Sequence, residues 1–116
     1  MRDFKKYEVW KISHKLVCNL YSVTNDFPSS EIFGLTSQLK RAAASIPTNI
    51  AEGCGRDTDA DFNRFLSIAA GSANETEYLL ILARDLTFIT EDTFKKFSSE
   101  ITLLKKKIYS LKQKLK

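Results

Sequence analysis

Few residues of this 116-residue chain belong to the types that carry out covalent chemistry. His14 is the only histidine, and Cys18 and Cys54 are the only cysteines. A nucleophilic cysteine needs a base beside it, and no histidine lies near Cys54 in the sequence. A zinc site needs several closely spaced cysteines or histidines, which this sequence lacks. These residues predict a protein that is not an enzyme, has no metal or other cofactor, and keeps both thiols reduced, with His14 at the surface.

Carboxylates are the other groups that could form an active site. A buried carboxylate needs a partner, and Arg41 and Arg56 can supply one to Glu52 and Glu75 if two antiparallel helices bring them together. We therefore expect these four residues and Asn49 to form one structural polar network. A carboxylate-based active site at the same place is the less favoured alternative.

The distribution of charge gives the clearest indication of function. The formal net charge is +4 and the pI is about 9.1. The last twelve residues contain no acid and six lysines: Lys105, Lys106, Lys107, Lys112, Lys114 and Lys116. Such a surface can contact the phosphate backbone of a nucleic acid, in a salt-dependent way and without reading bases. An ordinary solvated basic face is the alternative. A second basic edge, with Lys5, Lys6, Lys11 and Lys15, lies near the N-terminus.

Apolar residues recur at spacings of three and four along most of the chain, which is typical of amphipathic helices. The pattern predicts helices over residues 7–26, 35–52, 58–88 and 91–115. The first of them carries a second apolar stripe, Trp10, Val17 and Tyr21, and its apolar arc is wider than one antiparallel partner covers. We therefore expect this stripe to lie at an interface between subunits.

The second predicted helix contains a proline well past its first turn. Pro47 cannot donate a backbone hydrogen bond and its ring presses on the preceding turn, so a kink is expected. Gly53 is expected to end this helix as a left-handed cap. In the connection before it, Ile32 and Phe33 are expected to pack back onto the bundle.

Two runs of small residues, 42–45 and 69–73, lie in the second and third predicted helices. We expect these helices to pack closely along the two runs. The whole chain, residues 1–116, is then one all-α domain, an antiparallel up-down-up-down four-helix bundle with a proline-kinked second helix. The N-terminal residues lack the apolar region of a signal peptide, and no apolar run approaches the roughly 20 residues that span a bilayer. We expect a cytoplasmic protein with no membrane partner.

Two segments resemble a known family. Residues 34–53, GLTSQLKRAAASIPTNIAEG, resemble the signature of the four helix bundle protein family, also called the 23S rRNA intervening-sequence protein family. Residues 62–75, FNRFLSIAAGSANE, are similar to its third-helix block, and the resemblance extends over residues 4–115. The signature residues, which we interpret as determinants of fold and packing, are Arg41, Ser45, Pro47, Asn49, Glu52, Gly53, Gly71 and Glu75.

The resemblance implies a small bacterial protein without known catalytic residues. The family is similar to the accessory protein of diversity-generating retroelements, a pentameric barrel that binds nucleic acid and partners a reverse transcriptase. On this basis we expect a homo-oligomer, a pentamer, with Trp10, Val17 and Tyr21 at the subunit interface and a basic surface that binds RNA or DNA without sequence specificity. A reverse transcriptase or another protein is a further candidate partner. The alternative is a protein-interaction adaptor with no nucleic-acid role.

Overall fold

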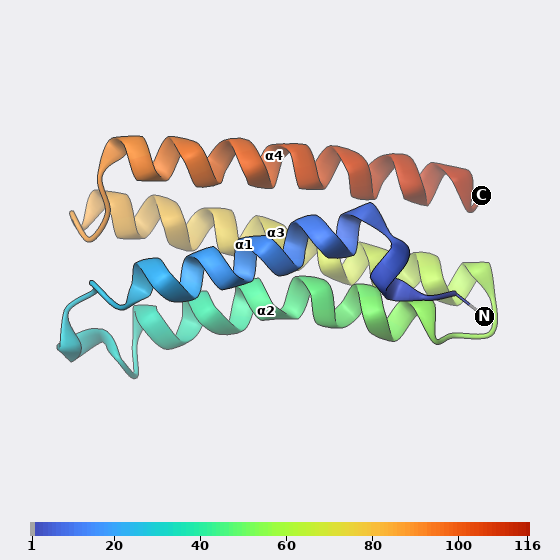
Figure 1. Ribbon diagram of the computed structural model, residues 1–116, viewed down its shortest axis with the longest axis horizontal. Helices are drawn as coiled ribbons and strands as arrows, with labels where there is room; N and C mark the ends of the chain where they lie inside the picture. The colour runs from blue at the N-terminus through green and yellow to red at the C-terminus, as the bar shows by residue number, and fades with distance from the viewer. Residues whose placement is uncertain (1) are drawn as a thin grey trace.

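A computed structural model describes residues 2–116, and it contains helices and no strand over that range. The elements are η1 (Phe4–Lys6), α1 (Glu8–Thr24), η2 (Ser29–Glu31), α2 (Leu35–Cys54), α3 (Asp59–Asp85) and α4 (Glu91–Lys114). The chain turns back at each connection between the long helices, so their directions alternate along a bundle about 43 Å long (Figure 1). The predicted all-α four-helix bundle is therefore confirmed.

The interface between α2 and α3 is the most extensive in the bundle, followed by that between α1 and α2. α4 packs on α3 and more lightly on α1. The apolar seam predicted for α4 is fully buried in its middle, at Phe97, Ile101, Leu104 and Ile108. Its ends are only half-buried. The core is therefore centred on the α2–α3 pair, and α1 and α4 cover it from either side.

Gly53 lies inside α2, which continues to Cys54, so its predicted role as a left-handed cap is wrong. The residue after the helix, Gly55, has a φ of −82°. A Cβ added at Gly53 would lie 2.7 Å from Cβ of Phe65 and 3.0 Å from Cδ1 of Phe62. Glycine is needed here because α3 passes so close to α2, and not because the backbone turns.

Small side chains line the rest of this interface. Ala42 and Ala43 of α2, and Ala69 and Ala73 of α3, are buried, as the expected close packing of the two helices requires. Gly71 does not take part, because it is exposed and a Cβ there would meet nothing within 4 Å. Its position on α3 faces solvent, so its role as a packing determinant is not supported.

α2 is continuous across Pro47, which is buried. Nearby, the Asn49 side-chain amide donates to the carbonyl of Ser45 (2.7 Å) and to its hydroxyl oxygen (2.9 Å). The same hydroxyl lies 2.8 Å from that of Ser72 on α3. These groups join the two helices beside the proline. The kink itself stays a prediction.

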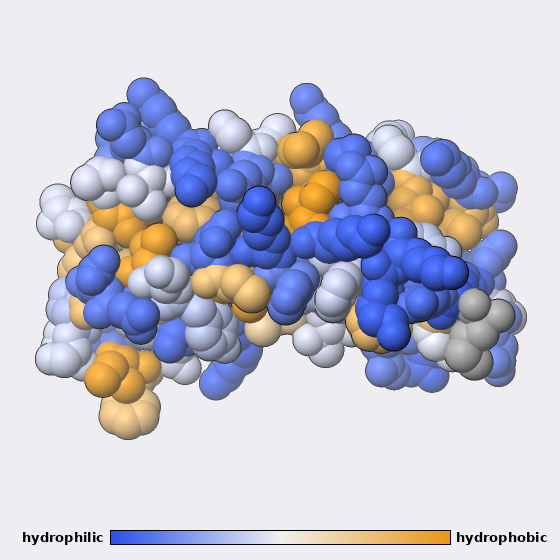
Figure 2. Space-filling view, in the orientation of Figure 1, coloured by the Kyte–Doolittle hydropathy of each residue, from blue (hydrophilic) through white to orange (hydrophobic). Residues whose placement is uncertain are grey.

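The loop before α2 carries an apolar projection. Phe33 is 98% exposed and Ile32 is 54% exposed, so the expectation that they pack onto the bundle is wrong. Figure 2 shows an apolar cluster standing out at the lower left, over this loop. The Glu31 carboxylate accepts a hydrogen bond from the N–H of Leu35 (3.1 Å) and holds the turn in a shape that directs both side chains outward. Phe27 is the loop residue that fills this end of the core.

The helix ends follow local rules. The hydroxyl of Thr58 accepts a hydrogen bond from the N–H of Asp61 at 3.1 Å. The hydroxyl of Thr90 accepts one from the N–H of Thr93 at the same distance. Both are the hydrogen bonds of N-caps. α3 ends three residues before its predicted limit of 88. Thr87 has a φ of 64°, a left-handed conformation that an α-helix does not continue through.

A matched pair of glycine variants tests the close approach of α2 and α3. Gly53→Ala should lower the free energy of unfolding by about 1–3 kcal/mol, because the added methyl group overpacks the core. Gly71→Ala should raise it by about 0.5–1 kcal/mol, because alanine is the better helix former at an open position. Urea unfolding followed by circular dichroism measures both. Equal effects of the two variants would contradict the assigned role of Gly53.

Candidate functional site

Two of the six lysines near the C-terminus hold α4 to its neighbours. The ammonium group of Lys105 lies 2.8 Å from a carboxylate oxygen of Glu77 and 3.1 Å from the amide oxygen of Asn74, both on α3. That of Lys107 lies 2.9 Å from the carboxylate of Glu8 on α1. Both lysine side chains are about two-thirds buried. These charges are therefore partly used by the fold.

The side chains of the remaining four lysines make no ion pair or hydrogen bond within the described residues, 2–116. Lys106, Lys114 and Lys116 are exposed, and Lys112 is half-buried. They lie toward the C-terminal end of α4, and Figure 1 places that end beside the start of α1. Four of the unpaired lysines of this helix thus lie toward one end of the bundle, and Lys95 and Lys96 lie toward the other.

A shallow groove of about 280 Å³ separates the end of α4 from the start of α1. Lys107 and Lys114 line it on the α4 side, and Glu8 lines it on the α1 side. Lys11 and Lys15 follow Glu8 at spacings of three and seven, so they continue the edge of α1 that faces α4. Among residues 2–116, Lys107 and Lys114 are the basic side chains that line the groove and Glu8 is the only acidic one.

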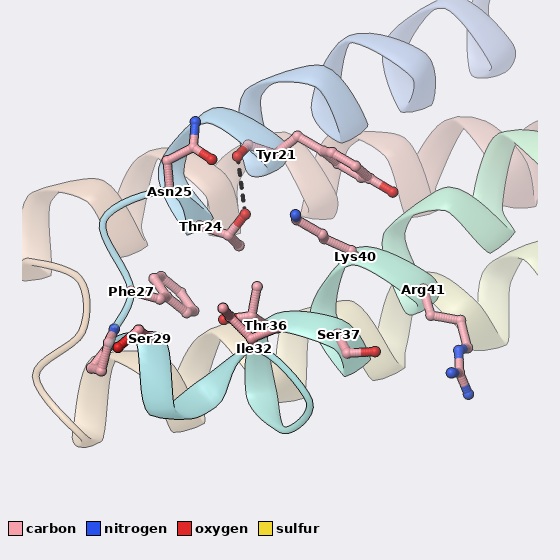
Figure 3. Close-up of a pocket in the computed structure, with 11 residues that line it drawn as sticks. Tyr21, Thr24, Asn25, Phe27, Ser29, Ile32, Thr36, Ser37, Lys40 and Arg41 are labelled. Atoms are coloured by element: carbon pink, nitrogen blue, oxygen red, sulfur yellow. Dashed lines mark hydrogen bonds between the residues drawn. The ribbon is translucent and has the colours of Figure 1, made fainter.

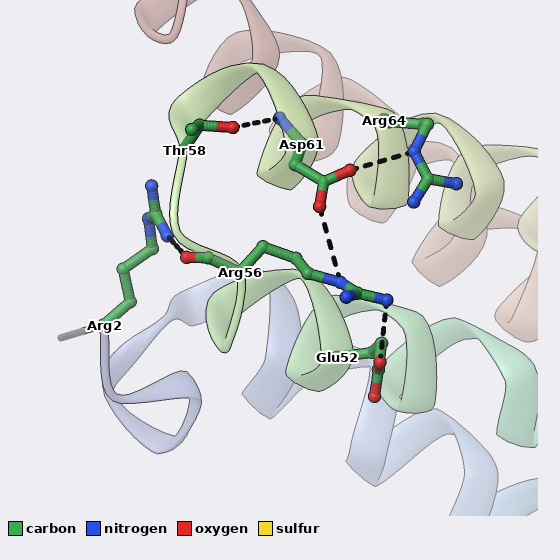
Figure 4. Close-up of polar contacts among 6 residues, drawn as sticks. All are labelled: Arg2, Glu52, Arg56, Thr58, Asp61 and Arg64. Carbon is green, nitrogen blue, oxygen red and sulfur yellow. Dashed lines mark hydrogen bonds and ion pairs between the residues drawn. The ribbon is translucent and has the colours of Figure 1, made fainter.

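Charged side chains also join the turn between α2 and α3, as Figure 4 shows. The Arg56 guanidinium lies 3.2 Å from Glu52 and 3.5 Å from Asp61, which in turn lies 3.0 Å from Arg64. Arg2 donates to the carbonyl of Arg56 at 2.8 Å and so ties the N-terminal segment to this turn. Glu52, Arg56 and Arg64 are exposed, whereas Arg2 and Asp61 are half-buried, and the cluster connects three segments of chain.

The single polar network expected from the sequence does not form. Glu52 and Arg56 belong to the cluster at the turn, whereas Asn49 bonds only within the Ser45–Ser72 group. Arg41 and Glu75 are exposed and join neither group within the described chain. Arg41 lies eleven residues before Glu52 on the same helix, about 16 Å away, which is beyond the reach of an ion pair.

The comparisons with known proteins agree with this architecture. The model of the 23S rRNA-intervening sequence protein family matches residues 5–110. The chain belongs to this family. It is also similar to a solved structure, that of a protein of unknown function from the S23 ribosomal protein family of Bacteroides thetaiotaomicron. The two are 30% identical, the match covers 89% of this chain and 96% of the other, and the TM-score is 0.78. No curated protein matches the chain.

The only histidine of the sequence lies at the surface, as expected, but beside a cysteine that the sequence analysis did not connect with it. His14 stacks on Trp10, with ring centroids 5.0 Å apart and planes 4° apart. Its Nε2 lies 3.8 Å from Sγ of Cys18. The spacing of four residues on one helix is the sequence signal that identifies such a pair. Cys54, the cysteine considered first, is buried.

Other sites that we considered from the sequence can be compared with the structure directly. Within residues 2–116, no three His, Cys, Asp or Glu side chains gather in a way that could hold a metal ion. No helix there has the length and apolar character to cross a membrane. Trp10 and Val17 are half-buried and pack against the protein's own core. Tyr21 is 44% exposed, with the ammonium of Lys40 4.8 Å from its ring centroid.

The two thiols of this family member should react at very different rates. The thiolate is the reactive form, and burial raises the pKa of the Cys54 thiol, so little of it is ionised near neutral pH. Iodoacetamide at about pH 8 should modify exposed Cys18 first and Cys54 only when the protein unfolds. Peptide mapping by mass spectrometry measures both rates. Equal rates in the native protein, with Cys18→Ser as the control, would contradict the assigned burial.

Proposed function

We propose that this protein is a non-catalytic, homo-oligomeric subunit, a pentamer in the cytoplasm, whose basic surface binds nucleic acid without sequence specificity. The observation that carries the proposal is the group of unpaired lysines at the end of α4, next to the basic edge of α1. Membership of a family named for 23S rRNA intervening sequences is consistent with it.

The chemistry of this surface suits a phosphate backbone. Unpaired, exposed ammonium groups gain binding free energy mainly by releasing the counterions condensed on a nucleic acid. Lys106, Lys114 and Lys116 meet this condition, whereas Lys105 and Lys107 are held by carboxylates. Tyr109 is the only aromatic residue among these lysines, so the surface offers no platform for stacking a series of bases. Binding of the backbone, without base readout, is the mode that these residues support.

A charge-reversal pair on one helix tests this proposal. Lys106→Glu with Lys114→Glu should weaken binding to RNA and to duplex DNA. The variant should also lower the slope of log K against log salt by about 1 for each phosphate that a lysine no longer neutralises. Fluorescence anisotropy at several salt concentrations measures both quantities.

The matched control changes the same charge at the other end of the same helix. Lys95→Glu with Lys96→Glu reverses two exposed lysines there and should leave the salt slope unchanged. No affinity of the wild-type protein at low salt would exclude the nucleic-acid role. Equal effects of the two pairs would show that net charge, and not this surface, governs binding.

Exposed apolar side chains at the opposite end of the bundle support the proposal of a homo-oligomer. Ile32 and Phe33 project from the loop before α2, and Tyr21, at the end of α1, is also exposed. Figure 3 shows Tyr21 and Ile32 on the wall of a cavity of about 620 Å³ between the end of α1 and the start of α2. Burial of such apolar side chains against another copy is favourable. A projection that meets a different surface on the next copy gives a head-to-tail interface, which can close into a ring.

Removing apolar surface from this loop tests the assembly. Light scattering at micromolar concentration should give the mass of a pentamer for the wild type and a smaller mass for Ile32→Ser with Phe33→Ser. Leu103→Ser, which removes an apolar side chain on α4 about as exposed as Ile32, should leave the mass unchanged. A wild-type protein that is monomeric would exclude the oligomer.

A protein-interaction adaptor is the second candidate function, and the nearly complete exposure of Phe33 favours it. In this case the lysines only keep the chain soluble, and the loop binds a different protein, for which a reverse transcriptase is one candidate. The charge-reversal pair separates the two functions. An adaptor keeps its protein partner when Lys106 and Lys114 are reversed, whereas a backbone binder loses its nucleic acid.

A further inference from the structure

His14 and Cys18 place two metal-binding donor atoms side by side on the outer surface of α1. The residues are one helical turn apart in the middle of a 17-residue helix, so the backbone between them is already ordered. Nε2 of His14 lies 3.8 Å from Sγ of Cys18, and both residues are exposed. No rearrangement of the fold is needed for an ion to reach both atoms.

The separation of these atoms is close to what a tetrahedral ion requires. A zinc–sulfur bond of about 2.3 Å and a zinc–nitrogen bond of about 2.0–2.1 Å, at a tetrahedral angle, put the donors about 3.6 Å apart. The observed separation of 3.8 Å is slightly larger, and a small side-chain rotation can close the difference. In the metal-free protein the same geometry allows a weak hydrogen bond between thiol and imidazole.

The surroundings of the pair hold it in place. The His14 ring stacks on the Trp10 indole with almost parallel planes, which restricts rotation of the imidazole. Lys11 and Lys15 precede His14 and Cys18 by three residues each, so they are their neighbours on the helix surface. The thiolate is the form of cysteine that binds a metal.

We propose that His14 and Cys18 form a two-donor site for a thiophilic divalent cation of the zinc class, with water completing the coordination. Binding forms one metal–sulfur and one metal–nitrogen bond, displaces two metal-bound waters and releases the thiol proton to solvent. Thiolate and imidazole ligands select Zn²⁺ and related ions over Mg²⁺ and Ca²⁺, which prefer oxygen ligands. Structural zinc sites have four protein ligands. Because this site has only two, it is expected to exchange its ion with solvent.

Titration of the full chain, without an affinity tag, with Co²⁺ alone tests the proposal. Co²⁺ should bind one ion per chain, produce a thiolate-to-cobalt charge-transfer band, and quench the fluorescence of Trp10, the only tryptophan of the chain. Zn²⁺ should displace it, and Mg²⁺ should have no effect. Since loss of an outer-shell partner already lowers metal affinity about 10–100-fold, His14→Ala should lower it about tenfold or more. Cys18→Ser should abolish the charge-transfer band.

Two controls make the outcome decisive. Cys54→Ala removes the buried thiol and should leave the titration unchanged. The Ile32→Ser, Phe33→Ser variant should bind Co²⁺ as the wild type does, because both donors come from one helix of one chain, whatever its state of assembly. A charge-transfer band that persists in Cys18→Ser, an affinity that His14→Ala does not change, or no band in the wild type would each overturn the proposal.

Discussion

The close approach of α2 and α3 near Gly53 is the constraint on which the rest of the bundle depends. A Cβ here would lie 2.7 Å from Cβ of Phe65, so there is no room for a side chain at this position. The alanines along the same interface extend the approach, and α1 and α4 then pack on either side of the pair. The hydrogen bond between Ser45 and Ser72 shows that polar groups, too, join the two helices. Two of the signature residues, Ser45 and Gly53, thus act at this interface, whereas Arg41, Glu52, Gly71 and Glu75 are exposed.

α4 depends on charge as well as on its apolar seam. Lys105 and Lys107 face opposite neighbours and bind Glu77 of α3 and Glu8 of α1. The Lys105–Glu77 pair is shielded from solvent on both sides, whereas Glu8 in the other pair is 68% exposed, so only the first should contribute more than the small amount typical of exposed ion pairs. The lysines further along the helix have no such partners within residues 2–116. The first lysines of this segment therefore stabilise the packing of α4, and the last ones carry unpaired charge.

α1 presents different chemistry on each side because its periodicity separates residues that are close in sequence. Trp10 and Tyr21 lie toward α2, and Glu8 lies toward α4. His14 and Cys18 lie between these edges and face solvent. The helix can therefore carry an apolar edge, a charged edge and a pair of metal-binding donors without conflict between them.

The sequence by itself determined the helices and the buried seam of α4, because these follow from spacings that act within one helix. The family was recognised from two signature segments, and the caps at Thr58 and Thr90 were located by the structure. Only the tertiary structure decided which lysines are paired, since Glu8 and Glu77 lie on other helices. It also decided why residue 53 is glycine, because the neighbour that excludes a side chain comes from α3. The exposure of Phe33 depends on the turn that Glu31 holds. Interactions between segments far apart in sequence have no local pattern, so they were available only from the fold.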